Sequence, residues 1–340
     1  DPGPGRALTL NILIVKLSSL GDVVHTMPAV QDILARFPQA KIDWVVERAF
    51  APLVTRCTGV NRVIPCELRR WRKSPLSAAT RSAWHAFKQD LQTQAYDWVI
   101  DAQGLTKSAL VARCAKLTPH GQRVAMANRT DGSGYEAPTR WVANRAYTMP
   151  AHCHAVTRSR ILCAMVLNYE MPVALSFGLK PLVNQGSLAP ENEAKRVAFV
   201  HGTSRADKEW PFEHWVSLGQ RLKAQGLGVD LLHGNDAEES RAHALAQRID
   251  GAVVWPRLSL DALTDRMASC AGVIGVDSGL SHIAVALDLP HVQIYNFDTA
   301  WRTGPLTQAL QDAHARQQTV FAQPTPDVNA VWQAWTEVAL

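Results

Sequence analysis

The stretch Ile12-Leu13-Ile14-Val15-Lys16-Leu17-Ser18-Ser19-Leu20-Gly21-Asp22 decides the fold of this chain. Its first four residues are an apolar run, typical of a buried parallel strand. A small polar loop with one carboxylate, Asp22, follows, and the residues after it lead into a helix. Open α/β sheets bind ligands at the carboxyl ends of their strands. We therefore expect a ligand site here, where Asp22 could take a proton from a substrate hydroxyl. Capping of the following helix is the alternative role.

Strand-like runs and helical patterns alternate along nearly the whole chain. The expected strands are 10–15, 41–46, 63–65, 98–101, 123–125, 197–201, 228–233, 252–255, 272–276 and 291–295. The expected helices are 28–37, 77–94, 106–116, 212–225, 238–248, 260–269 and 281–286. This alternation predicts an α/β fold with parallel sheets built from right-handed βαβ units.

A stretch rich in Pro, Gly and polar residues, 179–196, interrupts the alternation and is interpreted as an interdomain linker. The expected organisation is an N-terminal domain over 8–180, a linker over 181–196, a C-terminal domain over 197–324 and a final helix over 325–340. Residues 128–149 are expected to form a long loop. The final helix carries one apolar stripe, so it must pack on another part of the chain.

Composition narrows the functional class. The chain has 340 residues with a formal charge of +5, which permits an acidic partner without requiring one. It has six cysteines and no Cys-x-x-Cys, so we expect a reducing, cytoplasmic setting rather than a disulfide framework. No apolar run approaches the roughly 20 residues that span a bilayer. Residues 1–7 lack a signal-peptide pattern and are excluded from the fold argument.

Four cations surround one indole in the segment Arg69-Arg70-Trp71-Arg72-Lys73. Such a cluster suits phosphates, carboxylates or an anionic membrane surface. A solvated charged loop is the alternative interpretation.

Two strand-end segments in the second half have the composition of anion sites. The first offers hydroxyls on Thr203 and Ser204 and a cation on Lys208, which suit a diphosphate whose charge grows as it leaves. An ordinary helix entry is the alternative. The second is Asp277-Ser278-Gly279-Leu280-Ser281-His282, where a helix N-terminus and a permissive glycine favour an anion. Simple capping is again the alternative.

Glu238 follows another strand end in the same half of the chain. Its carboxylate suits a ribose hydroxyl, and interaction with the positive end of a helix is the alternative role.

Other site classes fit the sequence less well. A serine hydrolase using Ser278 and His282 is disfavoured because Gly-x-Ser-x-Gly is absent. No strand is followed by Gly-x-Gly-x-x-Gly and there is no Walker sequence, which disfavours dehydrogenases and P-loop nucleotidases. His152-Cys153-His154 lacks the rest of a zinc set, so no metal is expected.

Four motifs taken together resemble the ADP-heptose:lipopolysaccharide heptosyltransferases. They are KLSSLGD (16–22), DAQGL (101–105), DKEWP (207–211) and VDSGLSH (276–282), in the same order as in that family. The resemblance runs over about residues 10–335. Lys107 and the basic segment 69–73 are closest to the branch of the family that adds heptose to the inner Kdo residue.

The resemblance implies a GT-B architecture, in which two Rossmann-like domains with parallel sheets face a central cleft and the final helix packs back on the N-terminal domain. It implies an inverting, metal-independent glycosyltransferase without a cofactor. The donor would be ADP-heptose and the acceptor the inner Kdo of Kdo2-lipid A, in lipopolysaccharide inner-core biosynthesis. Such an enzyme would be cytoplasmic, peripheral on the inner membrane, with no nucleic-acid partner. Another heptosyltransferase branch and a non-catalytic nucleotide-sugar-binding protein are the alternatives.

The resemblance also implies roles for individual residues. Asp22 matches the catalytic base. Ser278 stands where a threonine is common, which keeps the hydroxyl. The implied donor-binding residues are Thr203, Ser204, Lys208, Glu238, Leu258, Asp277, Ser278, Gly279 and His282. The implied acceptor-binding residues are Ser19, Gly21, Arg69, Arg70, Arg72, Lys73, Gln103, Gly104 and Lys107.

Overall fold

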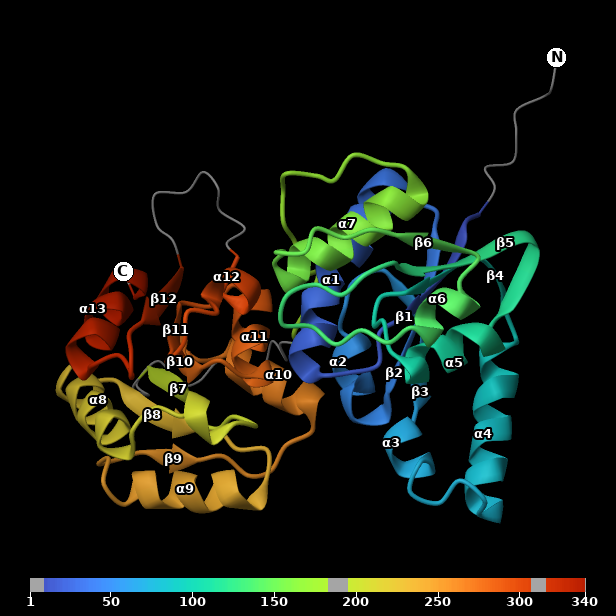
Figure 1. Cartoon of the computed structure of the whole chain (residues 1–340). Coiled ribbons are helices and arrows are strands. Elements are labelled where there is room, and N and C mark those ends of the chain that lie inside the picture. The colour runs from blue at the N-terminus through green and yellow to red at the C-terminus, as the bar shows by residue number, and fades with distance from the viewer. Residues whose placement is uncertain (1–8, 183–194, 307–315, 340) are drawn as a thin grey trace. The chain divides into compact units, whose positions relative to one another are not determined.

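The computed structural model describes residues 9–182, 195–306 and 316–339 (Figure 1). The chain divides into two compact units, Asp1–Gly178 and Leu179–Leu340. The division falls close to the expected end of the N-terminal domain. Most of the expected linker, residues 183–194, lies outside the described residues.

The N-terminal unit contains a six-stranded parallel sheet in the order β3-β2-β1-β4-β5-β6. Its strands are β1 (Asn11–Val15), β2 (Lys41–Glu47), β3 (Val60–Cys66), β4 (Ala95–Asp101), β5 (Lys116–Met126) and β6 (Arg145–Tyr147). Its helices are α1 (Leu20–Arg36), α2 (Ala51–Val54), α3 (Leu68–Trp71), α4 (Ala78–Leu91), α5 (Thr106–Cys114), α6 (Pro138–Val142) and α7 (Ala155–Leu167), with a 3-10 turn η1 (Arg48–Phe50).

The C-terminal unit contains a second six-stranded parallel sheet, in the order β12-β11-β10-β7-β8-β9. Its strands are β7 (Arg196–Val200), β8 (Gly228–Leu231), β9 (Val253–Val254), β10 (Gly272–Val276), β11 (His291–Tyr295) and β12 (Gln317–Phe321). Its helices are α8 (Phe212–Ala224), α9 (Asp236–Ala246), α10 (Leu260–Ala268), α11 (Gly279–Ala286), α12 (Ala300–Thr303) and α13 (Val328–Val338), with a 3-10 turn η2 (Ala206–Lys208).

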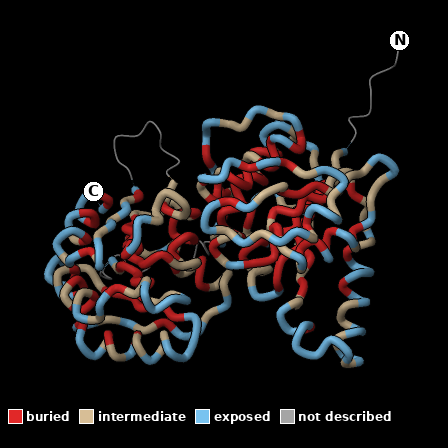
Figure 2. The backbone as a smooth tube through the Cα atoms, viewed as in Figure 1, coloured by how far each residue is buried: buried red, intermediate tan, exposed pale blue. Residues whose placement is uncertain are grey.

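The apolar runs that predicted strands form the centre of each unit, and helices flank both sheets (Figures 1 and 2). Ile12, Leu13, Ile14 and Val15 of β1 are fully buried, as a strand covered on both faces requires. The longest helix, α1, has 17 residues. Across the described ranges, no helix combines the length and the apolar character needed to cross a membrane.

Both sheets reverse their strand order at a central strand, and this reversal positions the candidate sites. In the first sheet β1 lies between β2 and β4, and in the second β7 lies between β8 and β10. Connections on either side of such a strand leave in opposite directions, which opens a crevice at its carboxyl end. The loop from Lys16 to Ser19 follows β1, and the segment beginning at His201 follows β7. Each candidate site therefore begins at a switch point.

The structure corrects three expectations about local structure. Helix α1 begins at Leu20, so Asp22 lies in the first helical turn rather than in a loop. The segment 128–149, expected to be a loop, contains α6 and β6. Helix α7 was not predicted, because it is buried on most sides and lacks a polar face with helical period.

The final helix is part of the core of the C-terminal unit. Helix α13 packs on β11, β12 and α8 of the C-terminal unit, and its Val331 and Trp335 are buried in the core of that unit. A Cβ atom at Gly272 would lie 2.6 Å from the Trp335 ring, so the glycine lets the indole approach β10. The apolar stripe of α13 is therefore covered within the C-terminal unit, by the sheet nearest to it in the chain.

Candidate functional site

Asp22 caps its own helix and keeps one oxygen available. The backbone N–H and the hydroxyl of Ser19 donate to Oδ2 of Asp22 over 3.1 and 3.0 Å. No hydrogen bond from the described residues reaches Oδ1. The N-cap of α1 is Ser19, so Asp22 is not the N-cap that the sequence offered as an alternative; it is the N3 residue of a capping box, and this role occupies only one of its two oxygens. The second oxygen can still accept a proton.

The charges around Asp22 keep it ionised. Burial alone would raise its pKa, but the positive charges of Lys16 and Arg158 and the hydrogen bonds from Ser19 outweigh burial and lower the pKa. Lys16 is itself only 2% exposed and donates to the carbonyl of Ala102 over 3.0 Å. Burial lowers the pKa of Lys16 to about 8, against the opposing charge of Asp22. A carboxylate in this setting is a weak base that is ready to accept a proton at neutral pH.

The segment after β4 holds the Asp22 loop in place. Gln103 accepts hydrogen bonds from the backbone N–H groups of Leu17 and Ser18, over 3.0 and 3.1 Å. Gly104 has a φ of +78°, a left-handed conformation that favours glycine. The ammonium of Lys107 donates to the hydroxyl of Ser18 over 2.8 Å. The predicted acceptor residues of this segment therefore contact the loop that carries Asp22.

The Asp101 carboxylate at the end of β4 fixes the segment that follows it through hydrogen bonds. Its Oδ1 accepts the N–H groups of Gln103 and Gly104, each over 3.0 Å, and its Oδ2 accepts the hydroxyl of Ser108 over 3.0 Å. Burial raises the pKa of Asp101 to about 6, although these hydrogen bonds oppose the rise. Asp101 thus fixes the turn from which Gln103 holds the loop that carries Asp22.

The predicted basic cluster is at the surface of the same unit. Arg69, Arg70, Arg72 and Lys73 are all exposed, on α3 and just after it. Arg70 is paired with Glu67 over 3.1 Å. The pKa of Lys107 is lowered first by burial and then by the charges of Arg69 and Arg72, which places these cations near it. The cluster therefore extends the positive field around Lys107.

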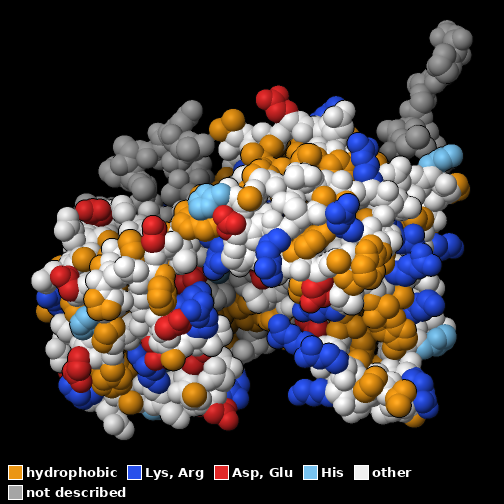
Figure 3. Space-filling model, viewed as in Figure 1, with side chains coloured by type: hydrophobic (Ala, Val, Ile, Leu, Met, Phe, Trp, Pro, Cys, Tyr) orange, Lys and Arg blue, Asp and Glu red, His pale blue; other side chains and the backbone are white. Residues whose placement is uncertain are grey.

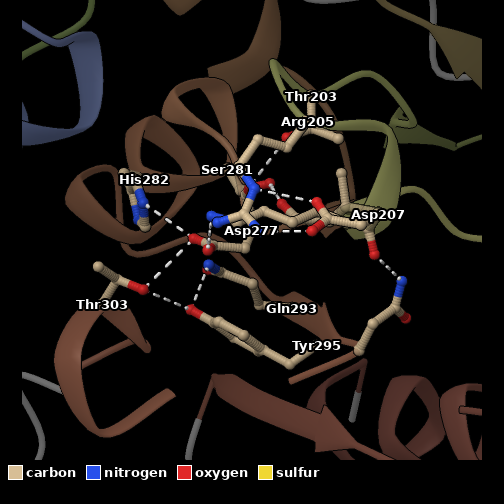
Figure 4. A network of polar contacts seen from close by, with 12 residues as sticks. Thr203, Arg205, Asp207, Asp277, Ser281, His282, Gln293, Tyr295 and Thr303 are labelled. Carbon is tan, nitrogen blue, oxygen red and sulfur yellow. Dashed lines mark hydrogen bonds and ion pairs between the residues drawn. The ribbon is translucent and has the colours of Figure 1, made fainter. Parts of the chain in front are cut away.

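In the C-terminal unit, Asp277 lies within a network of polar contacts that includes Thr203 and His282 (Figure 4), and Lys208 pairs with it. The ammonium of Lys208 donates to Oδ2 of Asp277 over 2.6 Å. The hydroxyl of Thr203 donates to the Asp277 carbonyl over 3.3 Å. A ring nitrogen of His282, Nε2, lies 3.6 Å from Oδ1 of Asp277. The ends of β7 and β10 thus bring a cation, a hydroxyl and a helix N-terminus together.

The start of α11 offers hydrogen-bond donors for an anion, beside an ionised carboxylate that is paired with Lys208. Burial would raise the pKa of Asp277, but hydrogen bonds and charge from His282 and Lys208 lower it far below its usual range. Ser278 is the N-cap of α11 and Gly279 its first residue. The Ser278 hydroxyl is buried and makes no hydrogen bond with the described residues. Together with the N–H groups of the first turn, it is a ready donor for a phosphate oxygen.

The other predicted donor residues are placed as follows. Glu238 lies in the first turn of α9 and accepts the N–H of Gly234 over 2.7 Å. A Cβ atom at Gly202 would lie 2.4 Å from the Glu238 carboxyl carbon, so the glycine leaves room for this carboxylate beside β7. Leu258 is half-buried between β9 and α10, and Ser204 is exposed. Glu238 is therefore close to the Lys208 segment, as a ribose partner requires.

Several residues near these sites were not predicted. Lys16, Asp101 and Arg158 act on Asp22 or its loop, and Arg158 comes from α7, far away in the sequence. In the C-terminal unit Thr303 donates to Asp277 over 3.4 Å and interacts with Tyr295 over 3.2 Å. Lys16 and Asp101 lie within the motifs KLSSLGD and DAQGL. A charged residue at the end of an apolar strand is the sequence signal that could have identified both of them.

The described residues contain no group of three His, Cys, Asp or Glu side chains arranged to hold a metal ion. The polar groups at both strand ends are instead one carboxylate with nearby cations in the N-terminal unit, and a lysine with a helix N-terminus in the C-terminal unit. The first arrangement suits proton transfer from a hydroxyl, and the second suits a diphosphate.

Comparison with known proteins agrees with this chemistry. The model of "Glycosyltransferase family 9 (heptosyltransferase)" matches residues 84–326. Lipopolysaccharide heptosyltransferase 1 of Escherichia coli K12 is 37% identical, over 93% of this chain and 94% of that protein. The solved structure of E. coli heptosyltransferase WaaC with ADP is 36% identical, with a TM-score of 0.84 over 97% of this chain and all of that chain. The same enzyme solved with ADP-2-deoxy-2-fluoro heptose matches with a TM-score of 0.77, over 95% of this chain and 98% of that chain, also at 36% identity.

Proposed function

The chain belongs to glycosyltransferase family 9, the heptosyltransferases, with a GT-B type fold, and from this premise we propose that it transfers heptose from ADP-heptose to the inner Kdo residue of Kdo2-lipid A. The observation that carries the proposal is the Lys208–Asp277 pair beside the start of α11, a cation and a helix N-terminus suited to a diphosphate. The similar enzyme solved with ADP supports ADP as the nucleotide.

In the proposed reaction, Asp22 acts as the general base. The acceptor hydroxyl oxygen attacks the anomeric carbon of heptose, its proton passes to Oδ1 of Asp22, and the bond from that carbon to ADP breaks. A carboxylate with a lowered pKa is too weak to remove the proton in advance. It accepts the proton as the new C–O bond forms, when the hydroxyl has become acidic. Attack on the face opposite ADP inverts the anomeric centre.

The departing diphosphate gains negative charge in the transition state. We propose that Lys208, the Ser278 hydroxyl and the N–H groups at the start of α11 stabilise that charge; the pairing of Lys208 beside this helix start and the unpaired Ser278 hydroxyl support this role. Glu238 would accept from the ribose hydroxyls. We propose that these groups suffice without a metal, so transfer should persist in excess EDTA.

We propose that the acceptor binds the N-terminal unit, with its Kdo carboxylate and phosphates near Lys107 and the basic residues of 69–73. These exposed cations also suit an anionic leaflet surface, which supports a peripheral association with the inner membrane. Such attachment should weaken as salt increases, because the charges are at the surface. Cosedimentation with anionic vesicles in low and high salt tests this part of the proposal.

One assay tests the function. Purified protein is incubated with ADP-heptose and Kdo2-lipid A while ADP release and the mass of the glycolipid are followed. The proposal requires ADP release that depends on the acceptor and a mass gain of one heptose. Binding of ADP-heptose without release, with every acceptor offered, would instead identify a nucleotide-sugar-binding protein.

A further inference from the structure

An apolar groove lies on the N-terminal unit beside the acceptor loop, formed by α3, α4 and α5. Its volume is about 760 Å³, within the range of small-molecule sites. Its apolar lining is Leu68, Trp71, Pro75, Trp84, Leu105 and Leu110. Figure 3 shows hydrophobic side chains gathered over α4 and α5 with Lys and Arg side chains beside them. Contiguous exposed apolar surface of this kind marks a binding site.

The wall of the groove is rigid. Trp71, Trp84 and Phe87 form a three-ring cluster, with ring centroids 5.6 to 5.8 Å apart. Trp71 and Phe87 are also part of the hydrophobic core that includes the central strands of the sheet. The aromatic wall is therefore preorganised and is not a side effect of loose surface packing.

The polar lining of the groove carries positive charge. Arg72, Arg81 and Lys107 line it, and Glu136 is the one carboxylate among its lining residues in the described ranges. Glu136 is already engaged, since it accepts the N–H of Thr106 over 2.6 Å. An apolar groove with cationic walls matches a molecule that joins a hydrocarbon part to phosphates or carboxylates.

The groove is continuous with the acceptor loop. Lys107 lines it and also donates to Ser18, four residues before Asp22. Leu105 and Thr106 connect this lysine to Gly104, whose turn is fixed by Asp101. A molecule whose polar head reaches Asp22 would therefore have any attached hydrocarbon beside the groove.

We propose that this groove binds a hydrocarbon chain of the acceptor lipid. The inference rests on the proposed function, because it assumes that the acceptor is an acylated glycolipid with anionic groups. The groove holds one chain against Trp84 and Leu110, while Arg72, Arg81 and Lys107 pair with the anionic sugar part. It is thus a second contact for the acceptor, which adds affinity for acylated over deacylated forms.

The test compares KM for two acceptors, Kdo2-lipid A and its fully deacylated sugar–phosphate part, in the same detergent. Leu110→Gln makes the groove wall polar without changing charge, and Leu110 is 48% exposed, so the fold should tolerate it. Met165→Gln is the matched control, because Met165 is also apolar and helical, is 44% exposed and lies outside the groove. Thr80→Trp, which fills the groove, is a second variant.

Leu110→Gln and Thr80→Trp should each raise KM for the acylated acceptor about tenfold and leave KM for the deacylated acceptor unchanged. Met165→Gln should change neither. An equal effect on both acceptors, or none on either, would overturn the groove proposal while transfer to the deacylated acceptor keeps the proposed function intact. If Leu110→Gln alters only vesicle binding in the absence of acceptor, the groove is a membrane contact and the proposal is wrong. Wild-type protein inactive on both acceptors would overturn the function, and the chain inference with it.

Discussion

Replacing Asp22 separates its two roles, base and helix cap. In Asp22→Asn, the amide oxygen can still accept from the N–H and hydroxyl of Ser19, but the side chain cannot accept a proton from a substrate. In Asp22→Ala both roles are lost. The pair of variants therefore distinguishes chemistry from folding.

The expected magnitudes differ for the two roles. Loss of a general base lowers kcat by roughly 10² to 10⁴, or about 3 to 5 kcal/mol of transition-state stabilisation. Loss of an N-terminal carboxylate from a helix costs about 0.3–1 kcal/mol, and loss of the cap hydrogen bonds about 0.5–2 kcal/mol. Both variants should therefore lose nearly all turnover. Asp22→Asn should be slightly less stable than wild type, because buried Lys16 loses the opposing charge, and Asp22→Ala should be less stable still, because it also loses the cap hydrogen bonds.

The assay measures kcat and KM with ADP-heptose and acceptor, the thermal midpoint, and ADP affinity by calorimetry. ADP affinity should not change, since the proposed ADP contacts belong to the C-terminal unit. Asp327 caps α13 through a 2.8 Å hydrogen bond from Ala330, so Asp327→Ala is the matched control for loss of a cap. It should reduce stability to a similar extent and keep turnover.

Two results would refute the base assignment. Turnover within a few-fold of wild type in Asp22→Asn would show that no proton needs to reach this carboxylate. Equal loss of turnover and stability in the Asp22 and Asp327 variants would show that Asp22 matters only as a cap.

Three further predictions follow from the charges. Lys208→Ala should lower kcat with ADP-heptose by about 10² to 10³, because the leaving diphosphate loses a preorganised cation; unchanged single-turnover rates would contradict this role. Lys16→Met removes a charge that lowers the pKa of Asp22, so that pKa should rise and the acidic limb of the kcat/KM profile should move to higher pH; an unshifted limb would disconnect the two residues. Burial lowers the pKa of His201 to about 4, so between pH 6.5 and 4 the unfolded chain binds a proton that the folded chain does not. The free energy of unfolding should therefore fall as the pH decreases from about 6.5 to 4, by on the order of 3 kcal/mol. Urea unfolding of His201→Gln should show a smaller decrease than wild type, and the exposed-residue control His85→Gln should not.

The sequence predicted the parts of the fold that depend on local pattern. Apolar runs such as 12–15 and 272–276 became fully buried central strands, because a parallel strand covered on both faces has no polar alternation. Elements without a clear pattern of their own were missed. Strand β6, with three residues, and helix α7, which is buried on most sides, carry no clear period of their own.

The candidate sites were predictable only in part. Asp22, Lys208 and Asp277 could be predicted as candidates because they follow strand ends. In a parallel α/β fold the loops at the carboxyl ends of the strands lie at the same edge of the sheet. The contribution of Arg158 to Asp22 was not predictable, because α7 reaches this loop through tertiary packing. The packing of α13 was not predictable from its stripe either, since a stripe indicates that a helix is covered but does not identify the covering surface.

The pairing of Lys208 with Asp277 has a consequence for product release in the proposed reaction. If a diphosphate binds Lys208 as proposed, the ammonium can return on product release to the Asp277 carboxylate, which is 2.6 Å away in this structure, so release exchanges one anionic partner for another. In the proposed reaction Asp277 would then compete with the diphosphate product for the same lysine. A cation shared in this way should hold a strongly charged product less tightly and should speed its release.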